Sequence, residues 1–250
     1  MAKCRVRSMT IGEGKPKICL PIVGKNDQEI IEQANSFAVY LYDLVELRID
    51  YYEDIHDKHK VLNILKKLRE IIAHPILLTY RSLREGGEIQ LSDQEYLDFV
   101  TYTTQSDFID MIDIELMSGN ELVFQLVEIA HKNHKKVVMS NHDFEKTPDK
   151  QELEERIEKM EILGGDILKI AVMPTCKKDV MDLLVLTAEM SERVNHPLVT
   201  MSMGKLGKIS RISGGLTGSA ITFACVGKAS APGQINVVDM QNILKVMHYV

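Results

Sequence analysis

The run Asp166-Ile167-Leu168-Lys169-Ile170-Ala171-Val172 is apolar at all but two positions. It stands between two segments, residues 149–163 and 178–194, whose apolar residues recur at helical spacing. A short apolar strand between amphipathic helices is typical of a parallel sheet, in which helices connect the strands and cover them. This part of the chain therefore predicts consecutive β-α units.

The same alternation extends over the whole sequence. Strand-like runs occupy residues 17–23, 43–49, 75–80, 108–116, 136–140, 166–172, 198–203 and 220–226. Helical runs occupy residues 28–38, 59–72, 93–104, 121–132, 149–163, 178–194, 208–216 and 235–248. Eight such units fit a closed barrel better than an open doubly wound sheet, which usually has about five to seven strands. We therefore expect an α/β fold, a (β/α)8 TIM barrel.

The first residues predict an addition to the barrel. The run 4–10, a turn at 11–15 and the following strand look like an extra N-terminal β-hairpin, which would plug the bottom of the barrel. The chain has 250 residues and no linker or low-complexity tract. We expect residues 1–250 to form a single catalytic barrel domain.

Composition excludes several classes of protein. A net charge of -6 argues against nucleic acid and anionic membranes as partners, because both require a basic face. The N-terminus has no apolar signal region, and every apolar run is shorter than the ~18 residues of a membrane span, so we expect a cytoplasmic protein. The four cysteines are far apart and include no Cys-x-x-Cys, which predicts reduced, mostly buried residues with no zinc site.

Charged residues follow several of the predicted strands. In a barrel the active site forms at the carboxyl ends of the strands. Alternation at the end of strand 43–49 puts Glu46, Arg48 and Asp50 on one face, where three charges need partners. Arg81 follows strand 75–80, with Arg84-Glu85-Gly86-Gly87 in the next loop. These residues predict a polar pocket at one end of the barrel.

Lys169 is the sharpest anomaly, because a lysine inside an apolar strand is rarely buried without a reason. Burial and nearby cations favour the free amine of a lysine, which is a nucleophile towards carbonyls. Alternatively, Lys169 reaches solvent at the end of its strand or pairs with Glu46 or Asp50. The other charged strand ends around the same rim favour the interpretation that Lys169 is a nucleophile.

His142 follows the strand before that of Lys169. Neighbouring strands lie about 4.8 Å apart, so both side chains could reach one substrate. Histidine exchanges protons near neutral pH, although a loop histidine satisfied by the backbone is the alternative. The pairs His56/His59 and His131/His134 lie at charged helix ends, and we expect no metal there. The glycine-rich stretch 213–219 lacks the Gly-Lys-Ser/Thr of a phosphate loop and is interpreted as a helix end and turn.

Taken together, the motifs resemble those of type I 3-dehydroquinate dehydratases over essentially the whole chain. The motifs are Glu46-Leu47-Arg48-Ile49-Asp50, Tyr80-Arg81 with Glu85-Gly86-Gly87, Ser140-Asn141-His142-Asp143, Leu168-Lys169-Ile170-Ala171 and Ser230-Ala231-Pro232-Gly233-Gln234. The resemblance implies a Schiff-base barrel without metal or other cofactor, usually a homodimer. It also implies a small-molecule substrate, 3-dehydroquinate, in the shikimate pathway to chorismate and the aromatic amino acids.

The resemblance also implies roles for individual residues. Lys169 matches the Schiff-base lysine, His142 the general acid/base and Glu85 the carboxylate that orients it. The substrate would be bound by Glu46, Arg48 and Arg81 at its hydroxyls and the pocket wall, by Arg211 at its carboxylate, and by Ser230 and Gln234 from a lid at 228–234. Apolar walls would come from Met201, Met203 and Phe223.

The implied reaction is a syn elimination of water that gives 3-dehydroshikimate. The substrate is a ring ketone with a carboxylate and hydroxyls, and an iminium on Lys169 would acidify the neighbouring C–H so that His142 can remove the proton. Two alternatives stay open. One is an aldolase or transaldolase type of Schiff-base barrel that binds a phosphate at Gly214, Gly215 and Gly218, and the other is a barrel that binds a carboxylate without turnover.

Overall fold

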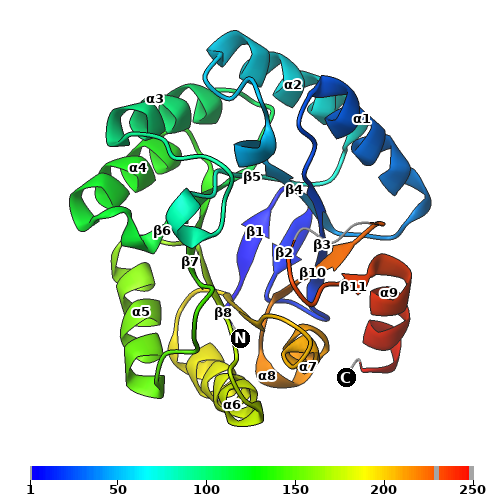
Figure 1. Cartoon of the computed structure of the whole chain (residues 1–250), viewed down its shortest axis with the longest axis vertical. Helices are drawn as coiled ribbons and strands as arrows, with labels where there is room; N and C mark the ends of the chain where they lie inside the picture. Colours follow the sequence, from blue (N-terminus) through cyan, green and yellow to red (C-terminus); the bar gives the residue numbers. More distant parts are fainter. Residues whose placement is uncertain (1, 228–230, 248–250) are drawn as a thin grey trace.

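The protein is a (β/α)8 barrel preceded by a small hairpin. The structure is a computed structural model that describes residues 2–227 and 231–247. All eight predicted barrel strands are confirmed: β3 (Lys17–Ile22), β4 (Leu44–Arg48), β5 (Ile76–Thr79), β6 (Met111–Glu115), β7 (Lys136–Asp143), β8 (Ile167–Val172), β9 (Leu198–Ser202) and β10 (Ile221–Cys225). They pair in parallel in the order β10-β3-β4-β5-β6-β7-β8-β9, and Figure 1 shows them surrounded by helices.

The ring of strands closes between β9 and β10 by contacts other than a regular ladder. The backbone N–H of Ala220 donates to the carbonyl of Leu198 at 2.8 Å. The Oγ of Ser219 accepts the N–H of Thr200 at 3.1 Å. These bonds join β9 to the residues just before β10, so the ring of eight strands is closed.

Helices connect the strands on the outside, as their apolar periodicity predicts. They are α1 (Asp27–Ser36), α2 (Lys58–Ile71), α3 (Asp93–Thr104), α4 (Asn120–Lys132), α5 (Lys150–Ile162), α6 (Lys177–Arg193), α7 (Lys208–Ile212), α8 (Gly214–Thr217) and α9 (Val237–Val246). Short 3₁₀ helices are η1 (Phe37–Val39), η2 (Ile49–Tyr51), η3 (Leu83–Glu85) and η4 (Leu116–Ser118). No helix of the described ranges is long and apolar enough to span a membrane.

Two helix predictions need correction. The predicted helix 208–216 is divided at Ser213, after which the chain turns close to the segment before β10. A Cβ at Gly214 would lie 2.5 Å from the carbonyl oxygen of Ser219, so only glycine allows this approach. The predicted helix 235–248 begins instead with a two-residue strand, β11 (Ile235–Asn236), and Asn236 caps α9 by accepting the N–H of Val238. The end of that prediction, residue 248, lies outside the described residues.

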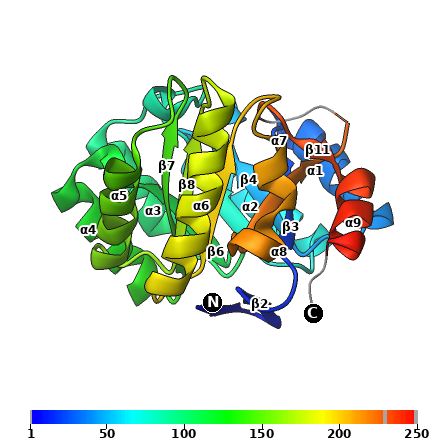
Figure 2. The same cartoon turned by 90° about the horizontal axis from the view of Figure 1, so that it is seen from below.

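The N-terminal hairpin is confirmed, but its predicted turn is wrong. Strands β1 (Cys4–Val6) and β2 (Met9–Ile11) pair antiparallel with Val6 opposite Met9, which leaves Arg7 and Ser8 as the turn. The predicted turn at 11–15 is the connection to β3, in which Gly12 and Gly14 adopt positive φ and redirect the chain. Figure 2 shows the hairpin across one end of the barrel.

The barrel interior has an apolar lower layer and a polar upper layer. Apolar residues of the hairpin pack against the first inward residues of the strands, namely Cys4, Val6 and Ile11 against Cys19, Leu44, Leu77, Met111, Val138 and Ile167. Above them the inward positions are polar and buried: Glu46, Thr79, Asp113, Ser140 and Lys169. All four cysteines are free, and Cys4, Cys19 and Cys225 are buried whereas Cys176 is exposed. The hairpin therefore closes the amino end of the barrel, and the polar layer faces the opposite end.

Candidate active site

A cavity of about 250 Å³ lies at the carboxyl ends of the barrel strands. It brings together nearly all the predicted site residues: Glu46, Arg48, Arg81, Glu85, His142, Lys169, Arg211 and Gln234, with Met201, Met203 and Phe223 as walls. Ala231 and Pro232 of the predicted lid also line it, as do Gly86, Phe144 and Ala171, for which no site role was predicted. Ser230 lies outside the described residues, as does part of the predicted lid 228–234. The glycine-rich stretch 213–219 forms α8 and a turn and does not line this cavity.

Lys169 points into the barrel from the middle of β8 and is only 4% exposed. Its Nζ lies 3.2 Å from the Oδ2 of Asp113 and 3.6 Å from the Oε1 of Glu46. The Nζ also lies 4.8 Å from the centre of the Phe223 ring. The amine is therefore buried beside two carboxylates and one aromatic face, at the bottom of a cavity that can admit a ligand.

Asp113 is the central residue that the sequence analysis missed. It extends from β6 and accepts hydrogen bonds from the Oγ of Ser140 at 2.6 Å and from Arg81 at 2.8 Å. Burial raises the pKa of Asp113, but the charges of Arg81 and Lys169 and these hydrogen bonds hold it below its ordinary value. Asp113 and Glu115 alternate with apolar residues, as Glu46 and Arg48 do in β4, so the same pattern could have revealed them.

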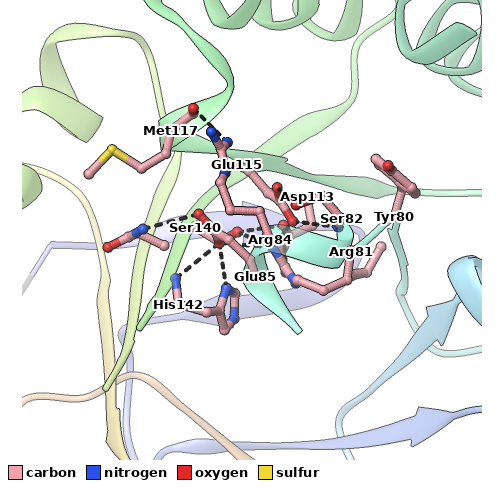
Figure 3. Close-up of polar contacts among 12 residues, drawn as sticks. Tyr80, Arg81, Ser82, Arg84, Glu85, Asp113, Glu115, Met117, Ser140 and His142 are labelled. Atoms are coloured by element: carbon pink, nitrogen blue, oxygen red, sulfur yellow. Dashed lines mark hydrogen bonds and ion pairs between the residues drawn. The ribbon is translucent and has the colours of Figure 1, made fainter. Parts of the chain in front are cut away.

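Arg81 ties this network together from the end of β5 and is 3% exposed. One terminal nitrogen donates to Glu115 at 2.9 Å and to the Oγ of Ser140 at 3.0 Å, and the other donates to Asp113. Figure 3 shows Arg81 beside these partners. Its side chain lines the cavity, but its strongest bonds are to protein carboxylates, which position it and balance their charge.

His142 and Glu85 form a hydrogen-bonded pair at the cavity wall (Figure 3). The Nδ1 of His142 lies 2.9 Å from the Oε2 of Glu85, and the backbone N–H of His142 donates to the same oxygen at 3.0 Å. Burial and the cations Arg81, Lys169 and Arg48 lower the pKa of His142 well below its ordinary value. Burial and Glu115 raise the pKa of Glu85 to about 7. The lowered pKa favours the neutral imidazole, and its Nδ1 lies against Glu85.

Two cavity arginines differ in their partners. Arg48 makes a bidentate pair with Asp50, with both N–O distances 2.8 Å, so Asp50 binds Arg48 and not Lys169. Arg211 has no carboxylate partner among residues 2–227 and 231–247, and its Nε is buried without a hydrogen bond. Among the described residues, its shortest hydrogen bond is from a terminal nitrogen to the carbonyl of Pro232 at 3.0 Å. Burial lowers the pKa of Arg211 to about 10. A buried cation without an anion is suited to binding an anionic ligand group.

This arrangement can bind a carboxylate at Arg211, attack a carbonyl with the amine of Lys169 and exchange a proton through His142. The register of β7 and β8 pairs Ser140 with Lys169 and His142 with Ala171, so Lys169 and His142 lie on the same face of neighbouring strands, two positions apart in height. The two groups can therefore act on adjacent atoms of one ligand.

Comparisons with known proteins agree with this geometry. A family model described as type I 3-dehydroquinase matches residues 18–249. The chain is 46% identical over 249 residues to a 3-dehydroquinate dehydratase of Listeria monocytogenes serotype 4a (strain HCC23), with 99% of each chain covered. It is 44% identical over 250 residues to that of Salmonella typhimurium (strain LT2), again with 99% of each covered. A crystal structure of type I 3-dehydroquinate dehydratase from Clostridium difficile, with covalently modified comenic acid, has a TM-score of 0.95 at 42% identity and covers 98% of this chain and 97% of its own.

Proposed function

Because the chain belongs to the type I 3-dehydroquinase family, its activity is the removal of water from 3-dehydroquinate, and we propose that it proceeds through an imine on Lys169. The enzyme is thus a hydro-lyase of the shikimate pathway. The observation that carries the proposal is that the buried amine of Lys169 and the imidazole of His142, which is paired with Glu85, line one cavity. The Clostridium difficile structure, which contains covalently modified comenic acid, supports a proposal of covalent chemistry.

The first step joins Lys169 to the substrate ketone. The free amine adds to the carbonyl carbon and one of its protons moves to the oxygen. A second proton, taken from solvent, lets that oxygen leave as water, so that a positively charged iminium with one N–H remains. The carboxylates of Asp113 and Glu46, 3.2 and 3.6 Å from the Nζ, lie where they stabilise this charge. The iminium withdraws electrons from the neighbouring carbon and makes its proton acidic.

The second step belongs to His142. With its Nδ1 on Glu85, the Nε2 carries a lone pair that takes the acidic proton, and the electron pair moves towards the iminium. The resulting imidazolium gives its proton to the departing hydroxyl, which leaves as water from the same face of the ring. Hydrolysis of the imine then releases 3-dehydroshikimate and restores Lys169.

The remaining site residues bind and enclose the substrate. The free donors of Arg211 match the substrate carboxylate, and Glu46, Arg48 and Gln234 line the cavity where the hydroxyls would lie. Arg81 is proposed to contribute mainly positive potential, because its nitrogens are bonded to carboxylates. Ser230 is assigned to the lid 228–234 on the resemblance alone.

We also propose a cytoplasmic homodimer in which residues 1–250 act as one catalytic domain. The family model that matches residues 18–249 supports one domain. The decisive experiment for the function is to mix purified protein with 3-dehydroquinate and follow the ultraviolet absorbance of the conjugated enone. The absorbance should rise with time, and no rise with a correctly folded protein would refute the proposed activity.

A further inference from the structure

We propose that Arg156, on the outer helix α5, is a positioning residue for the acid/base pair: it fixes the side-chain amide of Asn141 so that Glu85 is oriented towards His142. This inference rests on the proposed function, in which His142 moves the protons. It assigns a role to a residue that does not line the cavity.

The contacts form a continuous relay from the helix layer to the cavity. A terminal nitrogen of Arg156 donates to the Oδ1 of Asn141 at 2.6 Å. The Nδ2 of Asn141 donates to the Oε1 of Glu85 at 3.1 Å. The Oε2 of Glu85 lies 2.9 Å from the Nδ1 of His142 and also accepts the backbone N–H of His142 at 3.0 Å. Asn141 is 4% exposed and Glu85 is 2% exposed, so water does not compete for these bonds.

Arg156 fixes which end of the Asn141 amide faces Glu85. A guanidinium can only donate, so the end of the Asn141 amide that faces it must be the oxygen. The nitrogen of the amide therefore faces Glu85, whose Oε1 must accept. Because Oε1 accepts from Asn141 and Oε2 accepts the backbone N–H of His142, these contacts favour Glu85 as a carboxylate, which would accept a proton of Nδ1 and leave the lone pair on Nε2. Without Arg156, the amide could rotate and turn its oxygen towards the carboxylate.

The position of Arg156 is itself unusual for a charged residue. It neighbours Ile157, which packs into the core, and its side chain is 13% exposed. Glu152, one turn earlier on α5, binds the other terminal nitrogen. The Nε of Arg156 is buried and lacks a hydrogen-bond partner among the described residues, which costs free energy of folding. A residue at the solvent-exposed face of α5 could not reach Asn141, whereas Arg156 does.

Glu85 is placed where such a hydrogen bond changes its ionisation. Arg81 faces it from the end of β5, Asp113 and Glu115 from β6, and His142 from β7. Burial and Glu115 raise the pKa of Glu85 to about 7, whereas Arg81 and the hydrogen bond from Asn141 lower it. Loss of the bond should raise this pKa further, so less carboxylate would be present at neutral pH.

The test compares the pH dependence of kcat/KM for Arg156→Met and Arg193→Met. Arg193, at the end of α6, binds Glu154 and Glu158 of α5 but has no contact with Asn141. Its substitution therefore controls for general changes in α5. In Arg156→Met the acid limb should move to higher pH and kcat should fall about tenfold, the effect of losing a hydrogen bond to a charged group. Arg156→Lys, which keeps a cationic donor, should restore most of both. An acid limb identical to that of Arg193→Met would overturn the proposal.

A double-mutant cycle tests whether Arg156 acts through Asn141. Asn141→Ala should lower kcat, and adding Arg156→Met should lower it no further, whereas two losses that multiply would contradict the relay. If Arg156→Met does not fold, the ¹⁵N chemical shifts of the His142 ring report its tautomer in Arg156→Lys and Asn141→Ala. The Nδ1–H form should persist in Arg156→Lys and decrease in Asn141→Ala. Equal ring shifts in the two variants would overturn the relay. Wild-type turnover and its loss in His142→Ala test the proposed function separately.

Discussion

The Nζ of Lys169 lies 3.2 Å from the Oδ2 of Asp113, although β7 separates their strands. The same carboxylate accepts hydrogen bonds from Arg81 and Ser140, so it is held in one orientation. A single buried anion thus faces both the amine at rest and the iminium during the reaction. This contact links the polar layer of the barrel directly to catalysis.

Asp113→Asn keeps the shape of the side chain but removes the charge that balances Lys169 and Arg81. We expect the free energy of unfolding to fall by about 3 kcal/mol, because breaking a buried ion pair leaves uncompensated charge. We expect imine formation to slow at least tenfold. Denaturant unfolding and the rate of borohydride trapping measure the two effects. Asp182→Asn, which affects only a surface pair with Lys178, is the control, and equal behaviour of the two variants would contradict the assigned role.

His142→Ala separates imine formation from proton transfer. The variant keeps Lys169 and should still form an imine that borohydride traps. Turnover should fall by ~10² to ~10⁴, as expected when a general acid/base is removed. Steady-state assays and mass spectrometry of the trapped protein measure both quantities. Near-normal turnover would show that His142 has only a structural role.

Arg211→Lys keeps the positive charge but loses the two-pronged geometry that fits a carboxylate. We expect KM for 3-dehydroquinate to rise about tenfold or more. Trapping of a ketone without a carboxylate should change much less, because that ligand does not use the free donors of Arg211. If both ketones lose reactivity equally, Arg211 does not recognise the carboxylate.

The raised pKa of Glu85 predicts a pH-dependent stability difference between wild type and Glu85→Gln. Because the folded pKa of about 7 exceeds the ordinary value of 4.5, the native state holds more protons than the unfolded state between these values. Stability from this group is therefore present below pH 4.5 and is lost as the pH rises through 7. Glu85→Gln has no carboxyl group to ionise, so its free energy of unfolding should rise by up to about 3 kcal/mol relative to that of wild type between pH 5 and 8. Parallel stability curves over this range would contradict the shift.

Periodicity was sufficient for the barrel but not for its turns. The strands are buried on both sides and give short apolar runs, so all eight could be located from the sequence. Turns depend on local backbone geometry that glycines only partly reveal. The glycines at 12 and 14 suggested a hairpin turn, whereas the turn lies at Arg7 and Ser8, and Arg7 adopts a φ of 53° there.

The site was predictable where a charge interrupts an apolar strand, as at Lys169, and where a family motif could be matched, as at His142. Contacts between distant elements were not predictable in this way. Asn141 reaches Glu85 across 56 positions of sequence, and nothing in the local pattern of α5 indicates that Arg156 meets Asn141. Likewise, the lack of a carboxylate beside Arg211 within the described part of the chain is a property of the folded cavity.

The central claim, that Lys169 forms the imine, is tested most directly by borohydride reduction in the presence of 3-dehydroquinate followed by peptide mass spectrometry. The protein should be inactivated and carry one covalent adduct, located on Lys169, and Lys169→Met should carry none. An adduct on another lysine, or full activity after treatment without any adduct, would contradict the account.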